Sequence, residues 1–343
     1  MECITIKDVA RVCGVGVSTV SRAINNHPDI NPETKEMIMQ VIKENNYVPN
    51  NSARNLKRSD ARAIAILIKG ISNPFFNCMI KVFEEEIQKK KYSLVLQHVD
   101  AWQDETEVAL ELEKEKRLRG IIFLGGIASH SQEQLKKIPV PFVLSTVSLL
   151  GKEYKNDYSF VSVDDVKESC RMTEHLISQG HEKIALLCSY KEDVSIGALR
   201  LTGYKKALEA HNIPVDERWI RHMDPELDSY SMESGYRMTK ALLEEGVDCT
   251  AIFAISDSLA IGAVRALIDA GKRVPMDISV AGFDGTEMAA YYNPSITTIR
   301  QPAETMAKET IKLLFDSIKK KTNVQQLIFE GELVPGESVK KLN

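Results

Sequence analysis

Residues 4–25, ITIKDVARVCGVGVSTVSRAIN, constrain the fold more than any other stretch of the chain. Apolar residues recur at helical spacing up to Cys13, and Gly14 then interrupts the run. This pattern predicts two short helices joined by a tight turn. Val20, Ala23 and Ile24 give the second helix an apolar face, so its polar face is left to point outward. Such a pair of helices is typical of the helix-turn-helix, whose second helix enters the DNA major groove.

A third helix is predicted at 33–46, after an Asn31-Pro32 start that suits the N-cap and first helical positions. Its apolar stripe, which would close a three-helix core, consists of Met37, Ile38, Val41 and Ile42. Residues 47–62 are rich in basic and poor in apolar residues, which predicts a hinge with a short helix at 51–57. Leu56 stands almost alone there as an apolar residue. It is either a satellite packing residue or a wedge inserted between base steps from the minor groove.

Composition limits the class of protein without identifying it. With 343 residues, 43% hydrophobic and 27% charged, the chain is typical of a soluble protein of two or three domains. No apolar run approaches the ~20 residues of a membrane-spanning helix, and the N-terminus lacks an apolar signal core, so we expect a cytoplasmic protein. The six cysteines form no C-x-x-C pair, which favours reduced thiols over a metal site or disulfides.

The charge of the first 60 residues is unusually balanced for a DNA-binding segment, with eight Lys and Arg against seven Asp and Glu. The whole chain carries a formal net charge of −4. Non-specific affinity for DNA comes mainly from basic side chains at phosphates. We therefore expect specific contacts to supply much of any DNA affinity.

From Ala63 onward the pattern changes to alternating strands and helices. The first series comprises predicted strands at 63–68, 92–99, 120–126, 140–146 and 160–165, with helices at 73–91 and 104–117. The second series comprises strands at 183–189, 250–256 and 278–284 with helices between them. Alternation of this kind predicts two α/β lobes with parallel sheets. Ligands of such folds bind beyond the carboxyl ends of the strands, here in a cleft between the lobes.

The whole chain resembles the LacI-type bacterial transcriptional repressors. The resemblance is carried by ordered blocks that include ITIKDVARVCGV, STVSRAIN, NYVPNNSARNL, LISQGHEKIALL, AISDSLAIGAVRAL, GKRVPMDISVAGFD and PSITTIRQP. It implies a three-helix helix-turn-helix headpiece with a hinge helix, followed by two α/β lobes with parallel sheets as in periplasmic binding proteins. The implied domains are a headpiece at 1–47, a hinge at 48–61, an N-terminal lobe at 62–162 plus 301–328 and a C-terminal lobe at 163–300 plus 329–340.

The resemblance also implies the partners. A homodimer would bind a pseudo-palindromic operator in double-stranded DNA, and a small molecule in the cleft would change its affinity. The family's DNA-contacting positions match Thr5, Val17, Ser18, Thr19, Ser21, Arg22, Asn25, Thr34, Tyr47, Ala53 and Leu56. Among them Arg22 would bind a guanine edge with both arms of its guanidinium. Tyr47 has an alternative role as a cap on the three-helix core, and Thr19 as a helix-start residue.

The effector-binding positions that the resemblance implies are Phe75, Phe76, Arg200, Tyr230, Asp257, Asp284 and Gln301. An arginine and a carboxylate converging on aromatic rings suit a sugar or a nucleobase. The alternative for Asp257 and Asp284 is helix capping, and the alternative for Phe75 and Phe76 is core packing.

Three departures from the family pattern bear on the predicted site residues. Gly16 stands where relatives usually have a serine that caps the recognition helix, so we expect a slightly frayed helix start. Ser145-Thr146 and Ser256-Asp257 replace a carboxylate and a carboxamide that many sugar-responsive relatives carry. The ligand class therefore stays open between a sugar, a sugar phosphate, a nucleobase-like molecule and no tightly bound ligand.

Two other classes of protein share parts of this pattern. An exported solute-binding protein has two similar lobes but needs a signal sequence and has no use for residues 1–60. An enzyme needs a coherent catalytic set, and the sequence contains no G-x-S-x-G, H-E-x-x-H or P-loop motif. We therefore expect no enzymatic activity, no cofactor, no metal and no membrane partner. The sequence leaves open whether the protein represses or activates, and whether its effector is an inducer or a corepressor.

Overall fold

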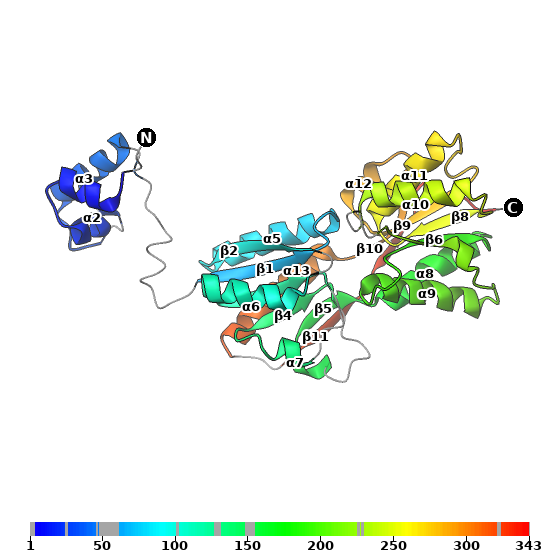
Figure 1. Ribbon diagram of the computed structural model, residues 1–343, viewed down its shortest axis with the longest axis horizontal. Coiled ribbons are helices and arrows are strands. Elements are labelled where there is room, and N and C mark those ends of the chain that lie inside the picture. The colour runs from blue at the N-terminus through cyan, green and yellow to red at the C-terminus, as the bar shows by residue number, and fades with distance from the viewer. Residues whose placement is uncertain are drawn as a thin grey trace. The chain divides into compact units, whose positions relative to one another are not determined.

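The computed structural model describes residues 4–24, 27–45, 47, 62–100, 103–126, 132–147, 155–224, 227, 230–320 and 324–342. The chain divides into two compact units, Met1–Ala61 and Arg62–Asn343. Figure 1 shows the helices of the first unit and the sheets and covering helices of the second.

The first unit is a small three-helix domain consisting of α1 (Ile6–Val12), α2 (Val17–Ile24) and α3 (Pro32–Glu44). Its fully buried centre contains five residues, one or two from each helix: Val9, Ala10, Val20, Ala23 and Ile38. Ala10 is small enough to let α1 and α2 approach closely. The predicted stripe on α3 is wrong at Met37, which is 41% exposed, because Ile38, Val41 and Ile42 already fill the space beneath the helix.

The first lobe of the second unit is built on a parallel sheet with the strand order β11-β5-β4-β3-β1-β2. Its strands are β1 (Ala63–Lys69), β2 (Ser93–Val99), β3 (Gly120–Leu124), β4 (Phe142–Ser145), β5 (Phe160–Val163) and β11 (Gln326–Phe329). Two helices, α5 (Phe75–Lys89) and α13 (Ala303–Ile318), cover one face. Two others, α6 (Glu105–Lys116) and the short α7 (Gln132–Leu135), cover the opposite face.

The second lobe is built on a sheet with the order β12-β10-β9-β8-β6-β7, parallel except for the β10–β12 pair. Its strands are β6 (Ile184–Cys188), β7 (Ile220–His222), β8 (Ala251–Ala254), β9 (Ser279–Asp284), β10 (Thr297–Arg300) and β12 (Glu332–Val334). Helices α8 (Asp165–Ser178) and α9 (Ile196–Ala210) lie on one face. Helices α10 (Met232–Glu244) and α11 (Asp257–Asp269) lie on the other, and the short α12 (Glu287–Tyr291) is nearby (Figure 1).

The chain passes between the two sheets at three places, after β5, after β10 and between β11 and β12. Because every central strand is parallel, the carboxyl ends of each sheet lie at one edge. No helix within the described ranges is both long and apolar enough to span a bilayer.

Candidate functional site

The outward face of α2 is polar, as the sequence predicts. Val17 is 42% exposed, Ser18 and Arg22 are exposed, and Thr19 and Ser21 are half-buried. Arg22 forms no ion pair with another described residue. The carbonyl of Gly16 accepts hydrogen bonds from the amides of Thr19 and Val20, so the helix begins directly after the glycine. This face presents a free guanidinium and short side chains, the combination that reads base edges.

Three other predicted DNA contacts lie among the described residues of the first unit. Thr5 is exposed, but its hydroxyl caps α1 and donates to Asp8 at 2.6 Å. Thr34 lies in the first turn of α3, whose start is capped by Asn31. Tyr47 packs against the three-helix core, which agrees with its alternative role as a cap. Asn25, Ala53, Leu56 and the hinge at 48–61 lie outside the described residues.

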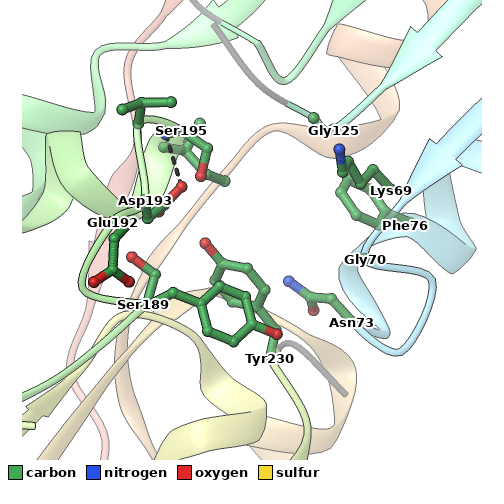
Figure 2. Close-up of a pocket in the computed structure, with 14 residues that line it drawn as sticks. Lys69, Gly70, Asn73, Phe76, Gly125, Ser189, Glu192, Asp193, Ser195 and Tyr230 are labelled. Carbon is green, nitrogen blue, oxygen red and sulfur yellow. Dashed lines mark hydrogen bonds between the residues drawn. The ribbon is translucent and has the colours of Figure 1, made fainter. Parts of the chain in front are cut away.

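A cavity of about 190 Å³ opens between the two lobes of the second unit. Figure 2 shows Lys69, Asn73 and Phe76 on one side, and Ser189, Asp193 and Ser195 on the other. We call this cavity the chamber. Its walls follow the carboxyl ends of strands of both sheets, β1 and β3 in the first lobe and β6 in the second. The chamber therefore occupies the place where ligands bind in folds of this type.

A second cavity of about 10 Å³ adjoins the chamber, since both are lined by Asn73, Phe76 and Ile196. Its remaining lining residues are Phe75, Thr146, Ser162, Asp165, Arg200, Asp284 and Gln301. A space of this size holds about one water molecule. In this arrangement of the lobes, the polar groups around the small cavity are closed off from any larger ligand.

Arg200 on α9 is the centre of a buried charge cluster. Its Nε donates to Asp165 at 2.9 Å, its Nη1 donates to the Ile255 carbonyl at 2.5 Å, and Nη1 lies 3.5 Å from the Asp284 carboxylate. Its guanidinium carbon lies 3.7 Å from the centre of the Phe283 ring. Arg200 is 2% exposed, and both carboxylates are equally buried. A charge this deeply buried is stable only because its partners and hydrogen bonds are complete.

Asp284 ends β9 with a φ of +114°, a conformation that costs of order 1–3 kcal/mol for a residue with a side chain. Its carboxylate accepts from Arg200, from Gln301 at 2.8 Å and from Asn73 at 2.9 Å. Asn73 belongs to the first lobe, and its Oδ1 accepts from the Phe75 amide at 3.1 Å. The side-chain amide is thereby aimed across the cleft, so the Asn73–Asp284 hydrogen bond joins the two lobes.

Asp257, a predicted effector-binding residue, hydrogen-bonds to other groups within the second lobe. Its carboxylate accepts from the Thr286 amide at 2.6 Å, from the Thr286 hydroxyl at 3.0 Å and from Thr298 at 2.6 Å. It lines neither of the two cavities. These bonds hold α11, β10 and the loop after β9 together, a structural duty close to the alternative that the sequence left open.

The residues that depart from the family pattern also have internal partners. The Ser145 hydroxyl lies 3.0 Å from that of Thr310, and the Thr146 hydroxyl accepts from the Gly125 amide at 2.9 Å. Ser256 caps α11. The groups that replace the missing carboxylate and carboxamide thus stabilise the edges of the sheets.

The structure brings five of the predicted effector residues to the small cavity or both cavities, namely Phe75, Phe76, Arg200, Asp284 and Gln301, and places Tyr230 at the chamber. It also reveals lining residues that the sequence reading missed: Lys69, Asn73, Asp165, Ser189 and Asp193. Lys69 ends β1 and Asp165 begins α8, and the other three lie in loops between a strand and a helix, positions that could have indicated them.

Burial raises the pKa of three carboxylates in the second lobe, and two of them, Asp165 and Asp284, are paired with Arg200. Burial raises the pKa of Asp165 to about 6, against the opposing effect of Arg200. Burial raises the pKa of Asp257 as well, with a further contribution from the nearby charge of Asp284. The pKa of Asp284 is raised by burial and lowered in part by Arg200. Below about pH 6 the cluster therefore favours a proton on Asp165.

We expect the free energy of unfolding of the second unit to depend on whether Asp165 is protonated. A raised carboxyl pKa contributes stability below the unfolded value of 3.8, and that contribution is lost as the pH rises through about 6. The variant Asp165→Asn carries a permanently neutral side chain. Its stability relative to the wild type should therefore increase as the pH rises from 4 to 7. Urea unfolding at several pH values measures the difference. A difference that is constant with pH would contradict the assignment.

Comparison with known proteins gives consistent matches along the chain. Residues 5–50 match the model for bacterial regulatory proteins of the lacI family, and residues 173–339 match a periplasmic binding protein-like domain. The chain is 42% identical to the HTH-type transcriptional regulator MalR of Clostridium butyricum, over 97% of this chain and 98% of that protein.

Two solved structures cover nearly the whole length. A complex of the transcriptional regulator CelR with cellobiose is 29% identical, with a TM-score of 0.71 over 98% of this chain and 99% of that one. The Lac repressor dimer bound to operator and the anti-inducer ONPF is 25% identical, with a TM-score of 0.75 over 99% and 100% of the two chains.

Proposed function

This chain belongs to the LacI family of bacterial regulatory proteins, and from that premise we propose that it is controlled by a neutral sugar bound in the chamber. It is a DNA-binding transcriptional regulator rather than an enzyme, and it binds operator DNA as a dimer under the control of a small molecule. We assign the headpiece to 1–47, the hinge to 48–61 and the two lobes to 62–162 plus 301–328 and 163–300 plus 329–340, and we place the protein in the cytoplasm with the DNA.

The charged side chains around the chamber favour a neutral ligand over an anionic one. Lys69 and Arg200 are the cations that line the two cavities within the described residues. Lys69 is held by Glu105 at 3.0 Å, and Arg200 is held by Asp165 and Asp284. An anionic ligand would have to break one of these pairs, whereas a hydroxyl group donates to the surrounding carboxylates and amides without doing so. This favours a sugar over a sugar phosphate.

Thermal unfolding with candidate ligands tests the proposal. A ligand that binds only the folded protein stabilises it by about 2.7 kcal/mol at a hundredfold excess over its Kd. Cellobiose, maltose, glucose or ribose should raise the melting temperature, while glucose 6-phosphate and hypoxanthine should leave it unchanged. Stabilisation by the phosphate or the base and by none of the neutral sugars would contradict the proposal.

The Asn73–Asp284 hydrogen bond should govern closure of the lobes. Since the chamber takes its walls from both lobes, a ligand binds the closed arrangement, and loss of this bond makes closure less favourable. Asn73→Ala should weaken sugar binding roughly tenfold, as expected for a hydrogen bond to a charged group. Calorimetric titration measures the affinity, and small-angle scattering measures the opening.

Asn77→Ala is the matched control, because Asn77 is an exposed asparagine in the first turn of α5, the helix that begins just after Asn73. It should leave both measurements unchanged. If Asn73→Ala also leaves them unchanged, the bond between the lobes does not control closure.

A further inference from the structure

Two buried polar atoms at the chamber have no hydrogen-bond partner within the described residues. They are Oδ2 of Asp193 and the hydroxyl oxygen of Tyr230, and both residues line the chamber. Nearly all buried polar groups in folded proteins are hydrogen-bonded, so each exception calls for an explanation. Two exceptions at the same cavity indicate that their partners arrive with a ligand.

The Asp193 carboxylate is held in place by its local structure. Its Oδ1 accepts from the Ser195 amide at 2.8 Å, just before α9 begins. A Cβ at Gly197 would lie 2.5 Å from Oδ2, so glycine at this position lets the carboxylate lie against the first turn of the helix. The positive end of the helix dipole stabilises a negative charge there. One oxygen is thus fixed, and the other is left open.

Tyr230 lies close enough to Asp193 for the charge of the carboxylate to affect the pKa of its hydroxyl. Burial raises the pKa of the Tyr230 hydroxyl well above its usual value, and the charge of Asp193 raises it further. The hydroxyl is therefore neutral and keeps its proton. It offers one donor and acceptor sites next to a carboxylate that only accepts.

The carboxylates paired with Arg200, unlike Asp193, already have their hydrogen-bond partners within the protein. Asp284 already accepts from Arg200, Gln301 and Asn73, and the space beside it holds about one water molecule. A sugar ring in the chamber therefore reaches unsatisfied groups at Asp193 and Tyr230, and only satisfied ones at Asp284.

We propose that Asp193 and Tyr230 form the pair that determines effector specificity, with the Asp193 carboxylate accepting a hydrogen bond from one sugar hydroxyl and the Tyr230 hydroxyl bonding a second. This rests on the proposed function, which places a neutral sugar in the chamber. Because a carboxylate only accepts, the pair selects a free hydroxyl at that position and rejects a phosphate or an O-methyl group.

Calorimetric titration of the full-length protein tests the pair. The probes are cellobiose, maltose, glucose, ribose and glucose 6-phosphate, and the variants are Asp193→Asn and Tyr230→Phe. For the neutral sugar that binds the wild type best, Asp193→Asn should weaken binding by roughly 10- to 100-fold and Tyr230→Phe by roughly 3- to 10-fold. The control Glu209→Gln removes an exposed carboxylate from α9, the helix that follows Asp193, and should stay within about twofold of the wild type.

The melting temperature of the ligand-free variants separates ligand binding from a structural role. Asp193→Asn should melt at the same temperature as the wild type or higher, since a neutral amide costs less to bury than a carboxylate without a cation. A clearly lower melting temperature would indicate a structural role and overturn the inference.

The results of these titrations distinguish failure of the specificity pair from failure of the proposed function. A wild type that binds a neutral sugar while Asp193→Asn binds it equally well overturns the specificity pair alone. A wild type that binds glucose 6-phosphate and none of the neutral sugars, or that binds none of the five probes, overturns the proposed function together with the pair.

Discussion

Replacing Arg22 with alanine is expected to abolish preference for the operator while leaving most non-specific DNA binding in place. Arg22 is exposed on the outward face of α2 and has no ion-pair partner among the described residues, so its guanidinium is free to bind a guanine edge. One such contact is worth about 1–3 kcal/mol of discrimination, and a dimer loses one in each half-site. The loss of specific affinity should therefore be roughly 30- to 20,000-fold.

The measurement is a titration of operator and of unrelated duplex at one fixed salt concentration, because salt changes both affinities. Lys43→Ala is the control, since Lys43 is an exposed cation at the far end of α3. It should lower both affinities slightly and to the same extent. An equal loss of operator and non-specific binding in Arg22→Ala would mean that Arg22 contacts phosphate only.

Replacing Arg200 with alanine should destabilise the second unit by about 3–5 kcal/mol, the usual cost of leaving a buried charge without its partner. The substitution leaves Asp165 and Asp284 buried without a cation, and it also removes the stacking on Phe283. The effector response should be lost with the stability. Urea unfolding followed by fluorescence or circular dichroism measures the change.

Arg218→Ala provides the comparison for a surface pair, because Arg218 is 80% exposed and pairs with Asp216. Exposed pairs contribute about 0–1 kcal/mol, so this variant should unfold close to the wild type. If Arg200→Ala were equally mild, the buried cluster would not support the lobe. Adding Asp165→Asn to Arg200→Ala should recover part of the lost stability, since it removes one of the unpaired charges.

The sequence predicts the elements with strong periodicity and misses those that depend on the rest of the fold. The central strands β1, β3, β6, β8 and β9 are apolar runs, and each lies within a residue or two of its predicted bounds. Strands β7, β10, β11 and β12 were missed because they have only three or four residues and form by pairing with neighbours distant in the sequence. Helices α10 and α13 were not predicted either, although both are amphipathic.

The candidate site was predictable where family motifs mark it and unpredictable where side chains compete for partners. Arg200 and Asp284 converge as expected, but the sequence gives no sign that they satisfy each other so completely. The sequence predicts a ligand-binding role for the Asp257 carboxylate, but in the structure this group accepts hydrogen bonds from Thr286 and Thr298. Asp193 stands in a loop without periodicity, and only the structure shows that one of its oxygens is left open.

Control of DNA binding by a sugar is the central claim, and selection of bound duplexes from a random pool, with and without the sugar that binds the chamber, tests it most directly. The account predicts enrichment of a palindrome of roughly 16–20 base pairs with half-sites a helical turn apart. It also predicts that the sugar changes the affinity for that palindrome in one direction or the other. An enriched palindrome whose affinity is the same with the chamber empty and with it saturated would contradict the account.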